Sequence, residues 1–462
     1  MPVSHQYWVN AFYWASDEHS LSPFMLMKFY IYTFGCQMSE HDSEYMGAVL
    51  LEKGYSSTEE ESAADIILVN TCCVREKVEH KIFTKLGRLA KLKRKNRELI
   101  IGVTGCYAQL AKEEIKRRMP QVDFVLGTQG IRRLPEVIDR LRSLRQGWDA
   151  MPKTDKQLEG FPCGFRRRSP VQAMVTIMEG CNNFCAYCII PFARGRERSR
   201  AAEEILREIK EAAAEGYKEV LLLGQNVNSY CDPSNNSISF ADLLIKIHQI
   251  KGIERIRFVT SHPKDFSYRL VEVIRDYPKI CNHIHLPVQS GSTRILKLMN
   301  RKYSRAEYME KIAWLKREVP EIGISTDIIV GFPEETEDDF QQTMKLMEEV
   351  EFDGIYSFKY SPRPLTRAYQ YPDTVPKEIK GRRLMELQGL QKRIQLTKNQ
   401  SLVGRVVEIL VDSVSKKDPY ALCGRTSSNR IVNFKGGPEL MGKFLRVKIV
   451  RAGPNSLFGE RV

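Results

Sequence analysis

Short apolar runs alternate with charged, helix-length stretches along most of this 462-residue chain, and that alternation limits the fold more than any other feature. Apolar runs lie at 66–70, 99–104 and 122–127, after a strand-like run at 29–33. Buried parallel strands have this continuous apolar character, because helices cover both faces of their sheet. We therefore predict a three-layer α/β domain over residues 28–150.

A second alternation of the same kind starts near residue 173, with helix-length stretches such as 201–215 and 305–318 between the strand candidates. Six successive βα units predict a partial (β/α)6 barrel related to the TIM barrel, and a helical stretch at 376–398 leads out of it. The six strand candidates lie at 173–178, 219–223, 256–260, 282–286, 323–330 and 354–360.

The chain changes character after about residue 400, where short strands at 406–411, 430–434 and 444–450 are joined by turn residues. This pattern predicts a small antiparallel β-barrel. From Lys398 onward, twelve basic residues stand against five acidic ones, so half of the net charge of +14 lies there. Such a basic surface indicates a polyanionic partner.

These changes of pattern also set the domain boundaries. We expect translation to start near Met27, because a strand-like run follows it at once. The expected parts are an N-terminal extension at 1–27, the α/β domain at 28–150, a linker at 151–170, the barrel at 171–397 and the small β-barrel at 398–462.

The chain has eleven cysteines. No stretch approaches the roughly 18 apolar residues of a membrane span, and the first residues lack a signal-peptide pattern. We therefore expect a cytoplasmic protein without membrane contact. In that reducing compartment, the cysteines indicate metal binding or catalysis before disulfides.

Three of these cysteines, Cys181, Cys185 and Cys188, form a C-x3-C-x2-C motif directly after the first predicted barrel strand. Active sites of such barrels lie at the carboxyl ends of the strands. Three thiolates can hold three irons of a cubane cluster and leave the fourth iron open. A structural zinc site is the alternative, but zinc takes four ligands and no further Cys or His lies near the motif.

A second group of cysteines is dispersed in the first domain, where Cys36, the adjacent pair Cys72 and Cys73, and Cys106 each follow a predicted strand. Parallel strands place their carboxyl ends at one edge of the sheet, so these loops are expected to meet. Buried structural cysteines are the alternative. The spacing alone leaves open which member of the pair faces the site.

The C-x3-C-x2-C motif resembles that of the radical S-adenosylmethionine (SAM) superfamily. The segments GCQM-x3-DSE at 35–44, NTCxVR at 70–75 and GCxAQ at 105–109 further resemble the methylthiotransferase family, in particular its MiaB branch acting on tRNA. The resemblance covers essentially residues 28–462. Further matching segments lie at 223–230, 260–263, 285–292, 299–301 and 325–333.

This resemblance implies two 4Fe-4S clusters. One, on Cys181, Cys185 and Cys188, would bind SAM and cleave it to a 5′-deoxyadenosyl radical. The other, an auxiliary cluster on Cys36, Cys72 and Cys106, would hold the sulfur, with Cys73 at a variable position. The product implied is a methylthio group on carbon 2 of N6-isopentenyladenosine at tRNA position 37, made with two SAM molecules.

The small β-barrel resembles a TRAM domain, which binds RNA. The partners implied are the tRNA anticodon stem-loop and an electron donor such as flavodoxin or ferredoxin, and we expect a monomer. Further contacts are expected at strand ends, although ordinary strand-exit turns explain the same residues. They are Gly224 and Gln225 for the methionine moiety, Ser261 and His262 for the cofactor ribose, and Gln289 and Ser290 for the adenine of the substrate.

The chain departs from the family pattern at Ser39, where Asn is usual, and at Leu365 and Arg367, where Gly and Pro are common. The remaining cysteines match no ligand position, and we expect them to be structural. They are Cys163, Cys231, Cys281 and Cys423.

Two related activities compete with this interpretation: methylthiolation of threonylcarbamoyl adenosine in tRNA, or of an aspartate in a ribosomal protein. The GCQM form of the first motif and the basic terminal barrel favour the isopentenyl branch. A non-catalytic metal-binding RNA-binding protein is the alternative from another class. Two separate cysteine trios oppose it, because a structural metal is fully ligated.

Overall fold

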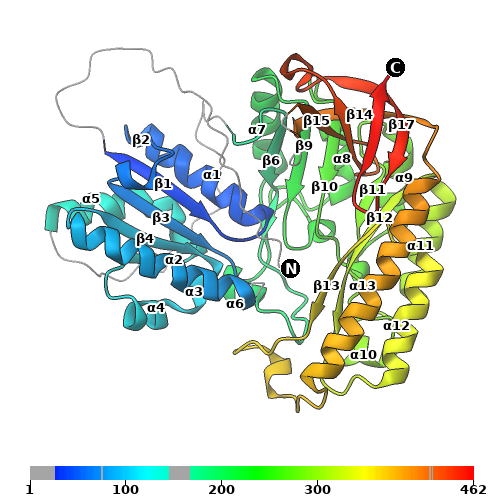
Figure 1. The fold of residues 1–462 in the computed structure, drawn as a ribbon, viewed down its shortest axis with the longest axis horizontal. Coiled ribbons are helices and arrows are strands. Elements are labelled where there is room, and N and C mark those ends of the chain that lie inside the picture. Colours follow the sequence, from blue (N-terminus) through cyan, green and yellow to red (C-terminus); the bar gives the residue numbers. More distant parts are fainter. Residues whose placement is uncertain (1–26, 74–75, 145–166, 416–417, 419) are drawn as a thin grey trace. The chain divides into compact units, whose positions relative to one another are not determined.

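The computed structural model describes residues 27–73, 76–144, 167–415, 418 and 420–462. The N-terminal extension, apart from Met27, and most of the expected linker at 151–170 lie outside these residues. The described residues form two compact units, one within 27–144 and one within 167–462 (Figure 1).

The first unit is a five-stranded parallel sheet in the order β2-β1-β3-β4-β5. Ile66 and Leu68 pack with Leu50 on one face, while Ile67 and Val69 are equally buried on the other. Both faces are therefore covered, and the predicted three-layer domain is confirmed. Its strands are β1 (Lys28–Thr33), β2 (Ser56–Ser57), β3 (Ile66–Thr71), β4 (Ile100–Gly105) and β5 (Phe124–Leu126).

Helical segments connect these strands and follow the last of them. They are α1 (Gln37–Glu52), η1 (Glu61–Ala63), α2 (Glu76–Lys95), α3 (Cys106–Leu110), α4 (Lys112–Arg118), η2 (Thr128–Arg133) and α5 (Leu134–Leu144).

The second unit contains the predicted partial barrel. Its six parallel strands form two three-stranded sheets, β10-β9-β6 and β11-β12-β13, which a parallel bridge between Ile256 and Ile280 joins. The six strand candidates of the sequence are confirmed. The strands are β6 (Gln172–Thr176), β9 (Glu219–Leu223), β10 (Arg255–Phe258), β11 (His283–His285), β12 (Gly323–Val330) and β13 (Gly354–Lys359).

A set of α-helices and a short hairpin belong to the same barrel. They are β7 (Met178–Glu179), α6 (Ile190–Arg194), β8 (Arg198–Ser199), α7 (Ala202–Ala214), α8 (Phe240–His248), α9 (Tyr268–Asp276), α10 (Thr293–Leu298), α11 (Arg305–Glu318), α12 (Glu337–Val350) and α13 (Lys377–Gln400). Short 3-10 segments complete the unit: η3 (Val227–Ser229), η4 (Pro263–Asp265), η5 (Arg367–Gln370) and, after the barrel, η6 (Pro438–Leu440).

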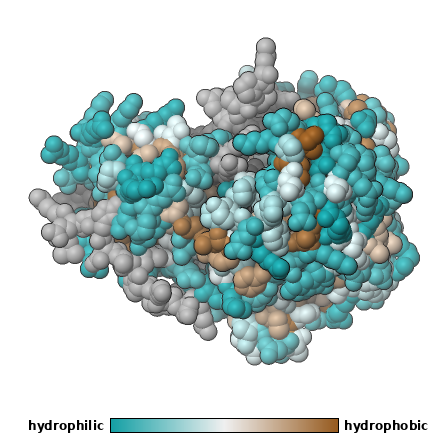
Figure 2. Space-filling view, turned by 90° about the horizontal axis from the view of Figure 1, so that it is seen from below, coloured by the Kyte–Doolittle hydropathy of each residue, from teal (hydrophilic) through white to brown (hydrophobic). Residues whose placement is uncertain are grey.

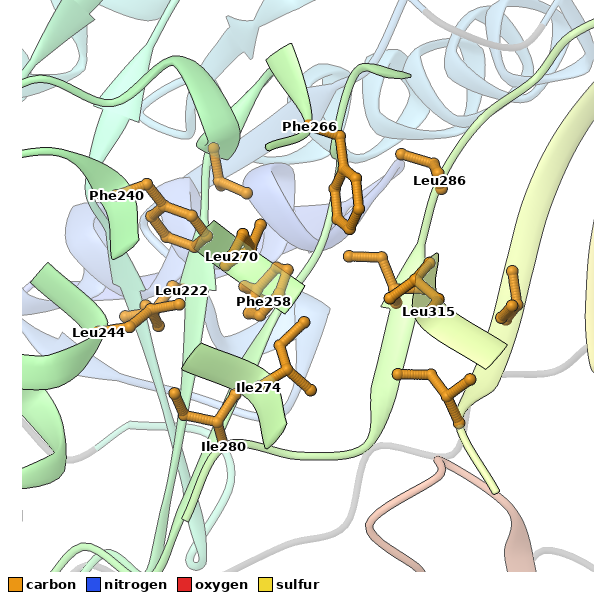
Figure 3. Close-up of a cluster of buried hydrophobic side chains, with 14 of the residues drawn as sticks. Leu222, Phe240, Leu244, Phe258, Phe266, Leu270, Ile274, Ile280, Leu286 and Leu315 are labelled. Atoms are coloured by element: carbon orange, nitrogen blue, oxygen red, sulfur yellow. The ribbon is translucent and has the colours of Figure 1, made fainter. Parts of the chain in front are cut away.

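The core of this unit lies between the strands and the helices (Figure 3). Phe240 and Phe258 meet edge to face with their ring centroids 5.1 Å apart. Fully buried side chains of this kind each contribute roughly 1.5–3 kcal/mol by leaving water. None of the helices in the described ranges has the length and apolar composition needed to cross a bilayer.

The terminal barrel is closed, in the order β14-β15-β16-β18-β17. The sequence predicted an antiparallel barrel, but β16 and β18 run parallel. A ring with an odd number of strands cannot alternate direction throughout, so one neighbouring pair has to be parallel. The strands are β14 (Val406–Val414), β15 (Ala421–Arg425), β16 (Ile431–Lys435), β17 (Phe444–Ala452) and β18 (Leu457–Arg461).

The terminal barrel docks onto the amino ends of the large barrel's strands. Arg257, in β10, donates to the carbonyl of Thr426 at 2.6 Å and to the Glu219 carboxylate, at the start of β9, at 2.9 Å. Arg430 bonds Asp353, just before β13, at 2.5 Å. These contacts occupy the end of the barrel opposite to the carboxyl ends of its strands.

Candidate active site

The cysteines expected to hold the auxiliary cluster lie at the carboxyl edge of the first unit's sheet. They are Cys36, Cys72 and Cys106. Cys36 lies three residues after β1, whereas Cys72 directly follows β3 and Cys106 directly follows β4. These three strands are neighbours, and their register pairs Thr33 with Asn70 and Thr71 with Gly105, so they end at the same level. The structure therefore brings the three predicted ligand loops together at one edge.

The loop of Cys36 packs closely on Cys72. A Cβ atom added at Gly35 would lie 2.7 Å from the Cβ of Cys72, closer than two such atoms approach. Cys72 therefore lies against the loop that carries Cys36. Cys73 is as buried as Cys72, so burial alone does not separate the two.

Polar groups lie beneath this edge. The Asn70 amide donates to the carbonyl of Ser39 at 2.7 Å and to the hydroxyl of Ser43 at 2.9 Å. The Asn70 Oδ1 and Thr104 Oγ1 atoms are fully buried and have no hydrogen-bond partner among the described residues. The unusual Ser39 is also buried, with its hydroxyl 3.8 Å from the Cys36 sulfur.

Helix α1 starts immediately after Cys36 and continues for 16 residues. The amino end of a helix carries a partial positive charge, which stabilises thiolates and other anions. Three cysteine sulfurs, a helix amino terminus and a buried hydroxyl donor make a chemically suitable set for an anionic iron–sulfur cluster.

The C-x3-C-x2-C motif lies in the loop between β7 and α6, at the carboxyl end of the first barrel strand. Its cysteines are Cys181, Cys185 and Cys188. The backbone fixes this loop, since Cys181 N–H donates to Gly195 O at 3.3 Å and Cys188 N–H to Cys185 O at 2.9 Å. Burial raises the pKa of the Cys181 thiol, and burial with the charge of Cys185 raises the pKa of Cys188 to about 12. Burial therefore disfavours the charged thiolates of Cys181 and Cys188, and binding to a cluster would offset that cost.

Among the residues that the structure describes, no three Cys, His, Asp or Glu side chains converge tightly enough to ligate one ion. A cubane cluster has a different requirement, because each cysteine binds a different iron of the cluster. The donor set of three soft thiolates fits such a cluster.

The residues that we expected to contact the cofactor at strand ends differ in their surroundings. The side-chain carbonyl of Gln225 accepts a hydrogen bond from Gly180 N–H, next to Cys181, and Gly224 lies against Met178. Both therefore support the cysteine loop. Ser261 is 3% exposed, and its hydroxyl has no hydrogen-bond partner among the described residues.

His262 lies against Cys185, with its Nε2 atom 3.9 Å from the sulfur. Burial, together with the charge of Arg301, holds the pKa of His262 far below its usual range, so the imidazole is neutral. The Arg301 guanidinium itself lies 3.4 Å from the same sulfur. The sequence marked 299–301 as a matching segment but gave Arg301 no role.

Gln289 and Ser290 differ in their surroundings. Gln289 has a left-handed backbone with φ of 73° and bridges to β12. Ser290 is fully buried, and its hydroxyl contacts Thr343 of α12 and accepts from Ser292 N–H. The Ser290 hydroxyl therefore has partners within the fold, and its expected contact with the substrate stays a prediction.

The carboxyl-end face of the barrel lies on the side of the molecule seen in Figure 2, where hydrophilic surface is interrupted by a few apolar spots. Large exposed apolar side chains lie within the cysteine loop (Phe184), in the helix α6 that follows it (Phe192) and after β13 (Leu365 and Tyr369). Leu365, which departs from the expected family pattern, has a φ of 72°, in the left-handed region that favours glycine.

Comparison with known families gives three matches along the chain. Residues 28–127 match "Uncharacterized protein family UPF0004", residues 175–347 match "Radical SAM superfamily", and residues 400–462 match "TRAM domain".

Two solved structures share the fold. The radical SAM methyltransferase TsrM from Kitasatospora setae has a TM-score of 0.54 at 12% identity, covering 74% of this chain and 77% of that one. The cobalamin-dependent radical enzyme OxsB has a TM-score of 0.51 at 13% identity, covering 79% and 56%.

Curated relatives named tRNA-2-methylthio-N(6)-dimethylallyladenosine synthase match almost the whole chain. The protein from Clostridium beijerinckii is 47% identical, covering 96% of this chain and 97% of the relative. That from Moorella thermoacetica is 46% identical, covering 94% and 98%. The chain therefore belongs to the family of tRNA-2-methylthio-N(6)-dimethylallyladenosine synthases, within the radical SAM superfamily.

Proposed function

We propose that this chain attaches a methylthio group to carbon 2 of N6-isopentenyladenosine at position 37 of tRNA. Two cysteine trios, each at the carboxyl ends of parallel strands, are the observation that carries this proposal. The full-length similarity to synthases of that name supports it. The TRAM domain and its basic surface favour an RNA substrate over the aspartate of a ribosomal protein.

We assign one 4Fe-4S cluster to Cys181, Cys185 and Cys188, and an auxiliary one to Cys36, Cys72 and Cys106. When bound, these clusters supply an open iron for SAM, an electron for its cleavage and a site for sulfur. Three cysteines at each site leave one iron without a protein ligand.

The chain's own side chains position these groups. Gln225 holds the backbone at Gly180 and so orients the loop of Cys181. The buried Ser261 hydroxyl is available to a hydroxyl group of the cofactor, in line with the expected ribose contact. We expect Gln289 to lie near the substrate. The target adenine has to be unstacked for the reaction, and the single-stranded anticodon loop allows this at low cost.

Arg446 and Lys448 are among the exposed basic residues of the terminal barrel and lie two positions apart on β17. Replacing both with alanine should weaken tRNA binding. The plot of the logarithm of the binding constant against the logarithm of the salt concentration should become less steep, by about 0.7–0.9 for each phosphate that the barrel no longer neutralises. Electrophoretic or fluorescence titrations at several salt concentrations would measure it. Arg405→Ala is the matched control, since Arg405 pairs with Glu321 of the large barrel. An unchanged slope in the double variant would argue against this face.

We further propose a low-potential one-electron donor such as flavodoxin or ferredoxin, a monomeric state and a cytoplasmic location. The electron donor is supported by the chemistry of a radical SAM cluster, which needs one external electron. The cysteine content supports a reducing compartment.

Nucleoside mass spectrometry tests the proposed function. The tRNA of a strain that lacks this chain should contain N6-isopentenyladenosine and no 2-methylthio derivative. Loss of methylthio-threonylcarbamoyl adenosine instead would identify the alternative substrate.

A further inference from the structure

We propose that Arg301 and His262 are positioning residues that set the reduction potential of the cluster on Cys181, Cys185 and Cys188, by donating hydrogen bonds to the Cys185 sulfur. The inference rests on the cluster assignment of the proposed function. It concerns two side chains to which neither the sequence motifs nor the relatives' names give this role.

The turn that carries Arg301 is fastened to the cysteine loop on both sides of Cys185. Ala186 N–H donates to Met299 O at 2.8 Å, and the Asn300 amide donates to Phe184 O at 2.9 Å. Asn300 itself has a left-handed backbone, with φ of 56°. These bonds fix the distance between this turn and the cluster ligand.

Arg301 is 4% exposed, and its guanidinium is fully engaged. It donates to Pro287 O at 2.6 Å, to the Tyr303 hydroxyl at 2.9 Å, and to the Cys185 sulfur and the Tyr187 hydroxyl at 3.4 Å each. Of these four acceptors, the cysteine sulfur is the one that carries negative charge when it binds iron. A buried cation requires such a counter-charge, so the contact between Arg301 and Cys185 is electrostatically the important one.

The tautomer of His262 follows from its other ring nitrogen. The Nδ1 atom accepts a hydrogen bond from Lys264 N–H at 3.2 Å, so the ring proton is on Nε2. The Nε2 atom is the one that faces Cys185, at 3.9 Å. His262 is therefore a second donor to the same sulfur, and a weaker one than Arg301 because it lies farther away, at 3.9 Å against 3.4 Å.

Both donors favour the reduced cluster. Reduction adds one electron, supplied by an external one-electron donor, and therefore one negative charge to the cluster. A positive charge and hydrogen bonds at a ligand sulfur stabilise that added charge and raise the potential. Removing either donor should make the cluster harder to reduce.

The test is a potentiometric titration, followed by optical and paramagnetic resonance spectra, of the reconstituted full-length chain carrying Cys36→Ala and Cys106→Ala. This background leaves the cluster under study as the one that is titrated. Arg301→Gln should lower its reduction equilibrium constant at least tenfold, which is about 59 mV for one electron. Arg301→Lys should recover part of the shift, and His262→Phe should give a smaller shift in the same direction.

Arg383→Gln is the matched control, because Arg383 is a buried arginine of the same unit that bonds Glu335 and Glu337. It should leave the potential unchanged. An unchanged potential in Arg301→Gln at full iron content would overturn the proposal. If that variant binds no iron, unchanged potentials in Arg301→Lys and His262→Phe would overturn it equally. A background chain that binds no iron would instead refute the cluster assignment.

Discussion

Cys181→Ala should remove about four iron atoms from the reconstituted chain and abolish the formation of 5′-deoxyadenosine. Two thiolates, those of Cys185 and Cys188, are too few to hold a cubane at this site, and without the cluster no electron reaches SAM. Iron analysis and chromatographic detection of 5′-deoxyadenosine under anaerobic conditions would measure both effects. The expected loss of SAM cleavage is complete.

Cys231→Ala provides the control for this variant, since Cys231 is an exposed cysteine of the same unit whose thiol contacts Asn236. It should retain all iron and all cleavage activity. Undiminished SAM cleavage by Cys181→Ala would mean that the radical cluster has been assigned to the wrong cysteines.

Cys36→Ala should separate the two halves of the reaction. It also removes about four iron atoms, but they come from the auxiliary site. The chain should still cleave SAM, because the barrel cluster is intact, yet tRNA should gain no methylthio group. Measuring 5′-deoxyadenosine and modified nucleoside in the same reaction would reveal this split.

The adjacent cysteines Cys72 and Cys73 give a matched pair for the same site. Cys72 packs on the loop of Cys36, so Cys72→Ala should behave like Cys36→Ala. Cys73→Ala should keep the iron and the product. The reverse pattern would transfer the ligand role to Cys73, and loss of SAM cleavage in Cys36→Ala would contradict the separation of the two clusters.

The strands of both α/β regions could be predicted because parallel strands are buried on both faces and read as continuous apolar runs. The six barrel strands lie close to their expected positions. The two-residue strands β2, β7 and β8 escaped prediction because they are too short to show a period. The parallel pairing of β16 with β18 depends on the closure of the ring, which no local pattern records.

The two groups of cysteines could be located from their motifs, whereas the side chains around them could not. Arg301 and Cys185 lie 116 residues apart in sequence, and only the fold brings them together. His262 was expected at the cofactor ribose, and its position against the Cys185 sulfur could not be predicted from the sequence. The hydrogen bonds of Ser290 within the fold likewise join residues whose contact the sequence does not show.

The most direct test of the central claim is nucleoside mass spectrometry of total tRNA from a strain that lacks this chain, with and without the gene restored. The deletion should accumulate N6-isopentenyladenosine, and the intact chain should restore its 2-methylthio derivative, whereas the Cys181→Ala and Cys36→Ala chains should not. Persistence of the 2-methylthio derivative in the deletion strain would contradict the account.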